Sequence, residues 1–128
     1  MKANELMIGD FVTRQNYENK DVVCKIIGLS KNSISVEFDN GSRSMGASED
    51  SISPIPLTPE ILEKNGFNIE ITPYTPDWKR CILNPNFFLE DRLKGFYHFN
   101  GNNLAKIQYV HELQHALKLC GIEKQIEL

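Results

Sequence analysis

Hydrophobic residues in the first half of the chain recur in short runs with a period of two. Ile34, Val36 and Phe38 alternate with Ser and Glu residues. This spacing is typical of a half-buried strand, because successive strand side chains point to opposite faces of the sheet. Similar short apolar runs predict further strands over residues 6–12, 22–29, 42–47 and 52–55.

The turn signals between these runs are short. Asp39-Asn40-Gly41 predicts a tight hairpin, because Asn-Gly readily takes the positive φ angles that such a turn needs. Five short strands within residues 1–57 leave little room for other elements. We therefore expect a small SH3-like β-barrel or bent sheet in this first lobe.

The pattern changes after Pro54 and Pro56. Thr58-Pro59-Glu60 is typical of a helix start, with an N-capping hydroxyl, proline in the first turn and an acid beside it. Gly66 predicts the end of this short helix. Alternating runs then predict strands, and an amphipathic segment closed by Gly121 predicts a terminal helix. The predicted strands cover residues 67–71, 79–83, 87–89, 95–99 and 104–108, and the terminal helix covers residues 109–120.

The predicted fold class is α+β, with an SH3-like lobe over residues 1–57 and an α+β lobe over residues 58–128. The second lobe is expected to be an antiparallel sheet with one short and one C-terminal helix. Because a domain of about 60 residues buries only about 60% of its unfolded surface, we expect the two lobes to share an interface.

Composition narrows the classes of function. The chain has 128 residues and a net charge of −3, and no stretch concentrates Lys and Arg, so nucleic acid is not expected as the main partner. No apolar run reaches the roughly 20 residues that span a bilayer, and the first residues lack a signal peptide pattern. The three cysteines are far apart and are expected to be buried, reduced and unpaired. These features predict a cytoplasmic protein without membrane contact.

One motif suggests an enzyme. His111-Glu112-Leu113-Gln114-His115 matches H-E-x-x-H, the signature of zinc metalloproteases. On a helix this spacing puts two imidazoles one turn apart, where they could share a zinc ion with Glu112 as general base. Both histidines lie opposite the apolar stripe of Leu113 and Leu117, which is also the pattern of an ordinary surface helix.

The third ligand argues against zinc. Thirteen residues follow His115, too few for a supporting helix that carries an acid. His98 could complete a site from a predicted strand, but we expect it to be a half-exposed sheet residue. We therefore predict no catalytic, cofactor-binding or metal-binding residue. If the alternative holds, His111 and His115 bind the metal and Glu112 is the base.

Trp78 is a candidate contact residue. It lies between Asp77 and Lys79 in a loop rich in proline. Large aromatic residues in polar loops are often energetic anchors of protein interfaces. We predict Trp78 as a partner contact.

The order and spacing of several short motifs resemble a known family. They are Leu6-x-Ile8-Gly9, Ile55-Pro56-Leu57-Thr58 followed by Glu60-Ile61-Leu62, Asn65-Gly66-Phe67, and Tyr109-Val110-His111-x-Leu113-Gln114. With them the chain resembles the small uncharacterised proteins encoded by Bacteroides-type gut bacteria and by their phages and prophages. The segment from residue 72 to residue 100 contains no matching motif and is similar only in its general pattern of hydrophobic and polar residues.

The resemblance bears on origin and on the zinc motif. It implies a phage or mobile-element setting, and it carries no functional residues. In similar sequences the position of Glu112 is often Gln and that of His115 often Asn, which implies a function other than zinc proteolysis.

Three functions remain for testing. The first is a non-enzymatic accessory or protein-interaction protein without a cofactor, whose partner is another protein. The alternative is a zinc-dependent hydrolase. The second alternative is a nucleic-acid-binding module built on the SH3-like lobe.

Overall fold

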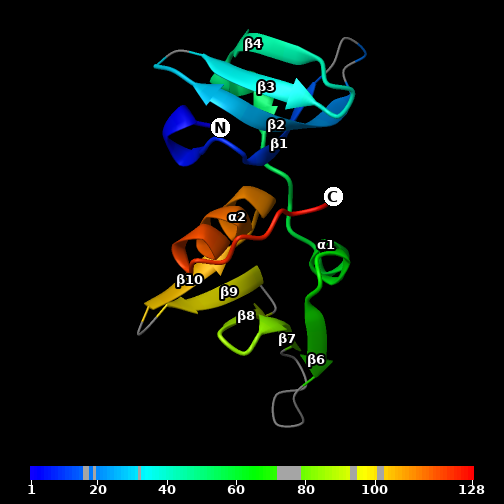
Figure 1. The fold of residues 1–128 in the computed structure, drawn as a ribbon, viewed down its shortest axis with the longest axis vertical. Helices are drawn as coiled ribbons and strands as arrows, with labels where there is room; N and C mark the ends of the chain where they lie inside the picture. The colour runs from blue at the N-terminus through cyan, green and yellow to red at the C-terminus, as the bar shows by residue number, and fades with distance from the viewer. Residues whose placement is uncertain (16–17, 19, 32, 72–78, 93–94, 101–102) are drawn as a thin grey trace. The chain divides into compact units, whose positions relative to one another are not determined.

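The computed structural model describes residues 1–15, 18, 20–31, 33–71, 79–92, 95–100 and 103–128 (Figure 1). The chain divides into two compact units. The N-terminal unit comprises Met1–Pro56 and Tyr109–His115, and the C-terminal unit comprises Leu57–Gln108 and Ala116–Leu128. Each unit contains an antiparallel sheet, so the predicted α+β class is confirmed.

The N-terminal unit is a meander of short strands. Its elements are the 3₁₀-helix η1 (Ala3–Glu5), β1 (Phe11–Gln15), β2 (Asp21–Leu29), β3 (Ile34–Phe38), β4 (Arg43–Ala47), the 3₁₀-helix η2 (Glu49–Ser51) and β5 (Ile52–Ser53). The strand order is β4-β3-β2-β1-β5 with antiparallel neighbours. Register shifts after Ile26 in β2 and after Ile34 in β3 increase the local twist. The prediction is confirmed in its bent-sheet form, because the order runs open from β4 to β5.

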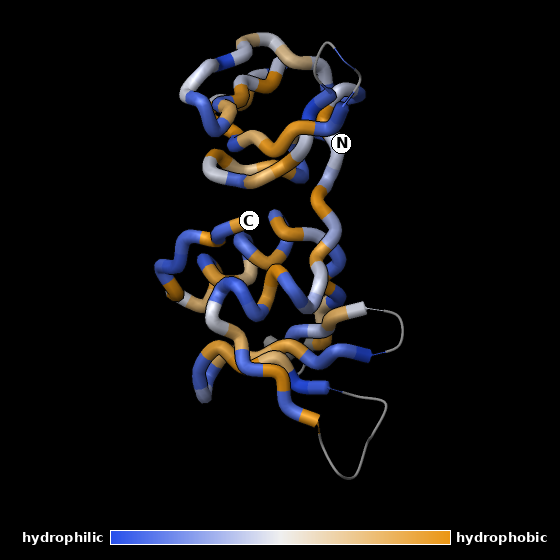
Figure 2. Tube along the Cα trace, turned by 90° about the vertical axis from the view of Figure 1, so that its right-hand side faces the viewer, coloured by the Kyte–Doolittle hydropathy of each residue, from blue (hydrophilic) through white to orange (hydrophobic). Residues whose placement is uncertain are grey.

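The core of this unit comes from alternate strand positions. Cys24 and Ile26 of β2 and Ile34 and Val36 of β3 are buried on one face of the sheet. Leu6, Val12, Ala47 and Ile52 complete the cluster. Figure 2 shows the repeated change between hydrophilic and hydrophobic positions along the strands that this arrangement requires.

The predicted hairpin at Asp39-Asn40-Gly41 is confirmed. The backbone N–H of Gly41 donates to the carbonyl of Phe38 at 2.9 Å, and Gly41 has a φ of 83°. Oδ1 of Asn40 accepts hydrogen bonds from the backbone N–H and the hydroxyl of Ser42. The turn therefore uses both the positive φ of glycine and the short side chain of asparagine.

The prediction of a strand over residues 6–12 is wrong for most of that segment, because β1 begins at Phe11. Met7 to Asp10 form a turn. The backbone N–H of Asp10 donates to the carbonyl of Met7 at 3.1 Å, and Oδ2 of Asp10 accepts from the backbone N–H of Met7 at 2.8 Å. A side chain that satisfies a nearby backbone group in this way competes with strand pairing.

The C-terminal unit follows the predicted sequence of elements. It contains α1 (Pro59–Lys64), β6 (Asn68–Ile71), β7 (Lys79–Asn84), β8 (Phe87–Arg92), β9 (Gly95–Asn100) and β10 (Asn103–Ile107). The strand order β10-β9-β8-β7-β6 is an antiparallel meander. The last helix, α2 (Val110–Leu119), begins in the N-terminal unit and ends in the C-terminal unit.

Side-chain caps fix the ends of α1. Oγ1 of Thr58 accepts a hydrogen bond from the backbone N–H of Ile61 at 3.3 Å, as the sequence predicts for an N-cap. Asn65 follows the helix and is buried. Its side chain donates to the carbonyl of Glu127 and accepts from the backbone N–H of the same residue, at 2.8 and 2.7 Å. Asn65 therefore ties the C-terminal tail to α1.

Candidate functional site

The structure brings His111, Glu112 and His115 together at the start of α2. The sequence places both histidines opposite the apolar stripe, a position compatible with a cleft and with an ordinary surface helix. In the structure His111 is buried, with only 4% of its surface exposed. The reason is that the segment Gly9–Phe11 of the same unit binds this side of α2. Leu113, on the apolar side, is fully buried as predicted.

Gln114 makes two hydrogen bonds with that segment. Its Nε2 donates to the carbonyl of Gly9, and its Oε1 accepts from the backbone N–H of Phe11, both at 2.9 Å. One amide side chain thus satisfies a backbone acceptor and a backbone donor that lie more than 100 residues away. Sequence reasoning missed this role, because nothing local to Gln114 indicates its partner.

Glu112, the general base in the zinc-hydrolase hypothesis, caps the N-terminus of α2. Its Oε1 accepts a hydrogen bond from the backbone N–H of Tyr109 at 3.1 Å. Tyr109 immediately precedes α2, and Glu112 is the third residue of the helix. This is the acid half of a capping box, in which the third helical residue reaches back to the N-cap N–H.

His115 pairs with a buried carboxylate. Its Nε2 lies 2.7 Å from Oδ2 of Asp10, and the carboxylate-bearing side chain of Asp10 is 1% exposed. Oδ1 of Asp10 and Nδ1 of His111 are buried and have no hydrogen-bond partner among the residues that the structure describes. Sequence reasoning missed Asp10, because nothing near it in the sequence indicates a partner in the last helix.

His111 lies where a charge is disfavoured. Burial lowers the pKa of its imidazole, and His115 acts in the same direction. Asp10, Glu112 and Glu5 act in the opposite direction, but burial is the largest cause. His111 and His115 also line a cavity of about 440 Å³ with other residues of the N-terminal unit.

The geometry supplies no third metal ligand for the zinc-hydrolase hypothesis among the described residues. Within the part of the chain that the structure describes, no group of three or more His, Cys, Asp or Glu residues could hold a metal ion. His98, the upstream candidate, belongs to the C-terminal unit and stacks on Phe87 with 4.6 Å between ring centroids. It is buried, which corrects the expectation of a half-exposed residue.

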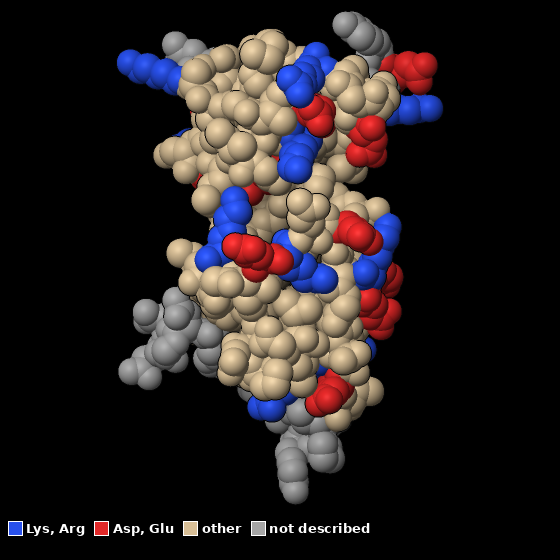
Figure 3. Space-filling model, viewed as in Figure 1, with Lys and Arg blue, Asp and Glu red and all other residues tan. Residues whose placement is uncertain are grey.

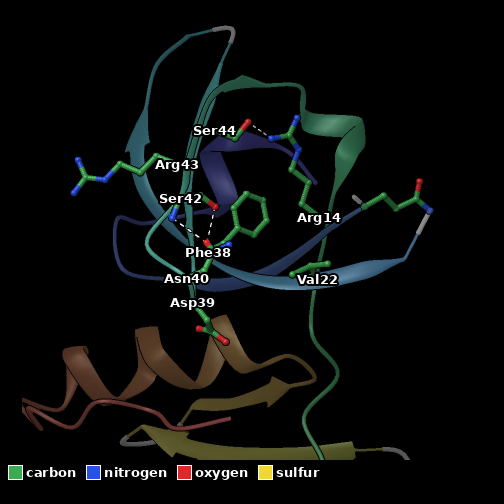
Figure 4. Close-up of a pocket in the computed structure, with 9 residues that line it drawn as sticks. Arg14, Val22, Phe38, Asp39, Asn40, Ser42, Arg43 and Ser44 are labelled. Atoms are coloured by element: carbon green, nitrogen blue, oxygen red, sulfur yellow. Dashed lines mark hydrogen bonds between the residues drawn. The ribbon is translucent and has the colours of Figure 1, made fainter. Parts of the chain in front are cut away.

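A different site opens on the bent sheet. A pocket of about 720 Å³ lies among the end of β1, the start of β2, the end of β3 and the hairpin into β4. Its lining residues are Arg14, Gln15, Val22, Phe38, Asp39, Asn40, Ser42, Arg43 and Ser44. Figure 4 shows the ring of Phe38 near the middle of this group, with Arg14 extending past it towards Ser44.

The contact between Arg14 and Ser44 joins strands that are not neighbours in the sheet. Nη1 of Arg14 in β1 donates to Oγ of Ser44 in β4, whereas β2 and β3 lie between these strands in the hydrogen-bonded order. The bend of the sheet therefore brings the two side chains together beside Phe38. Sequence reasoning missed this pocket, because the alternation of β3 predicts only that Phe38 faces the core.

Two other predicted features have mixed outcomes. Trp78 lies outside the described residues, so its predicted partner contact stays a prediction.

Burial raises the pKa of the Cys24 thiol and of the Cys81 thiol to about 11. These two cysteines are buried and unpaired, as expected. Cys120 is exposed, which corrects the expectation for the third cysteine.

The charged side chains form no concentrated patch on the face seen in Figure 3, where Lys and Arg alternate with Asp and Glu. No helix in the described part of the chain is long and apolar enough to cross a membrane.

Comparison of the chain with protein-family models, with curated proteins and with solved structures gives no match.

Proposed function

We propose that this chain is a non-enzymatic protein-interaction protein that binds its partner at the pocket of the N-terminal unit. The observation that carries the proposal is the pocket itself, which combines an aromatic ring and an aliphatic side chain with polar groups. Ligand sites commonly have this composition, an apolar floor with a few polar groups that orient the ligand.

The state of the zinc motif supports the same proposal. Glu112 caps the helix, Gln114 binds the backbone of Gly9 and Phe11, and His115 pairs with Asp10. Each of these side chains has an intramolecular partner that explains its presence. The interspersed charges and the net charge of −3 support a protein partner over a nucleic acid.

Site-directed photo-crosslinking tests the proposal. Gln15 lines the pocket and is exposed, so a photoreactive phenylalanine at this position would lie beside a bound partner. Glu63, an exposed residue of α1, is the matched control position. In cells of the native host we expect a specific protein to crosslink from position 15 and not from position 63. The same products from both positions, or none from position 15, would contradict the proposal.

The setting of the protein belongs to the same proposal. The family resemblance supports an accessory protein of a phage or mobile element of Bacteroides-type bacteria. Genes for lysis, packaging or replication beside the coding sequence are the expected result of inspecting the genomic neighbourhood. A neighbourhood of conserved metabolic genes in unrelated genomes would contradict it.

A further inference from the structure

Two arginines line the pocket, and they differ in their partners. Arg43 is exposed, and its Nε donates to Oε2 of Glu37 at 2.9 Å. Arg14 is half-buried and donates to the neutral hydroxyl of Ser44. Among the described residues, no carboxylate forms a salt bridge with Arg14. In Figure 4, Arg43 extends away from the ring of Phe38, and Arg14 lies beside it.

A half-buried guanidinium without a carboxylate retains binding capacity. Arginine carries five N–H donors in a planar fork that matches the two oxygens of a carboxylate. Partial burial weakens the competition from water, so a carboxylate that reaches Arg14 gains more than it would on an open surface. Asp39 also lines the pocket, but its carboxylate points away from the Phe38 ring and from Arg14 (Figure 4).

The floor beside Arg14 is apolar. Phe38 packs against the core of the unit and also lines the pocket, and Val22 lies below it in Figure 4. A volume of about 720 Å³ is larger than one side chain requires. The site therefore fits an apolar side chain and a carboxylate on neighbouring residues of one segment. The net charge of −3 disfavours a polyanion such as a nucleic acid in the same place.

We propose that the pocket binds a short peptide segment of the partner in which an Asp or Glu residue adjoins an apolar residue. The carboxylate pairs with Arg14, and the apolar side chain packs on Phe38 and Val22. This inference rests on the proposed function and names the chemistry of the partner.

The test is an amide NMR titration of the full chain with two capped pentapeptides. One carries Glu between two Leu residues, and the other carries Gln in place of Glu. We expect the Glu peptide to shift the amides of Arg14, Val22 and Phe38 and to bind about tenfold more tightly than the Gln peptide. Arg14→Gln should remove this difference. Arg80→Gln, the matched control at an exposed arginine of β7 outside the pocket, should leave both affinities within about twofold.

Further arms keep the result decisive. If Arg14→Gln does not fold, Arg14→Lys replaces it, and the preference for Glu should shrink because the planar fork is lost while the charge remains. Equal affinity for the two peptides, shifts confined to other residues, or tighter binding of a single-stranded oligonucleotide would overturn the inference. A crosslink from position 15 without any preference for Glu would overturn the peptide chemistry alone. Failure of both experiments would overturn the proposed function as well.

Discussion

Glu112 shows how a residue suited to proton transfer can serve the geometry of a helix. The first N–H groups of an α-helix lack intrahelical acceptors, and Oε1 of Glu112 satisfies the N–H of Tyr109 just before α2. Glutamate and glutamine both have an oxygen that can accept this hydrogen bond. A glutamine at this position would therefore keep the cap.

Substitution of Glu112 separates capping from catalysis. Glu112→Gln should change the free energy of unfolding by less than about 0.5 kcal/mol, because the acceptor oxygen remains. Glu112→Ala removes it and should cost about 1 kcal/mol, as for other caps. Urea denaturation of both variants measures the difference. Equal destabilisation by both substitutions would show that the charge of Glu112, and not its hydrogen bond, matters.

His111 makes the stability of the protein depend on pH. Burial lowers its pKa below the usual 6.5, so on acidification the unfolded chain takes up this proton before the folded chain does. The contribution of neutral His111 is therefore complete above about pH 6.5 and is lost as the pH falls below that value. His98 contributes with the same sign, because burial lowers its pKa too.

Denaturation at a series of pH values tests this prediction. Between pH 5 and pH 7 the free energy of unfolding should rise, and the rise should be smaller in His111→Gln. His98→Gln should also reduce the slope, in an independent part of the chain. A slope that is unchanged in His111→Gln would mean that the pKa of this imidazole is the same in the folded and the unfolded protein.

The chemistry of the site could be predicted only where it is local. The spacing of His111 and His115 fixes their common side of the helix, and the sequence shows that directly. What covers that side depends on Asp10 and on the backbone of Gly9 and Phe11, which lie about 100 residues earlier. A helical pattern cannot encode such a partner, so the burial of His111 could not be predicted from the sequence.

At the scale of elements, α2 has two buried sides at its start. Leu113 is fully buried, and Gln114, next in sequence, binds the turn that leads into β1. Gly9 is part of that turn and has a φ of 98°. Its backbone N–H donates a hydrogen bond to the carbonyl of Ile26. The helix is thus attached to the start of β1 and to the turn before it by hydrogen bonds between the Gln114 side chain and the backbone.

Gln114→Ala tests this attachment. The substitution leaves the carbonyl of Gly9 and the N–H of Phe11, both partly buried, without their partner. Because an unsatisfied buried group costs about 1–3 kcal/mol and water still reaches partly buried groups, we expect a loss of about 1–2 kcal/mol in the free energy of unfolding. Faster hydrogen exchange at Phe11 should accompany it. Unchanged exchange at Phe11 would show that the bond contributes little.

The apolar side of α2 offers a comparison within one helix. Leu117 is 1% exposed, whereas Leu119, two residues later, is 83% exposed. Leu117→Ala should cost about 2–5 kcal/mol, and Leu119→Ala should change stability by less than about 0.5 kcal/mol. Thermal and urea denaturation measure both. Similar losses in the two variants would mean that helix propensity, and not burial, sets the effect.

Most elements could be predicted because their signals are local. The period of two in β3, the Asn40-Gly41 turn and the Thr58 cap each depend on adjacent residues, and all three are confirmed. The segment over residues 6–12 misled the same reasoning. Its apolar residues favour a strand, but the side chain of Asp10 holds a turn there, which a hydrophobic pattern does not record.

At the scale of the whole molecule, the N-terminal unit is discontinuous in sequence. The change near Pro56 from alternating strand patterns to the signals of a helix start predicts a boundary between residues 57 and 58. That Tyr109–His115 joins the first unit follows from hydrogen bonds such as that between Val110 N–H and the carbonyl of Ile55. Contacts of this sequence separation are beyond any local pattern. The unit therefore completes its hydrogen bonds only when the last helix has formed.

The final prediction concerns metal and catalysis together. Because the described residues offer no third ligand and Nε2 of His115 lies against Asp10, we expect no stoichiometric zinc in protein purified without chelators. EDTA should leave the melting temperature unchanged, whereas a structural or catalytic zinc would make it fall. Metal analysis and a peptidase assay on the wild type and on Glu112→Gln complete the test. About one zinc per chain that is lost in His115→Ala, or peptide turnover that disappears in Glu112→Gln, would replace the interaction proposal with a hydrolase.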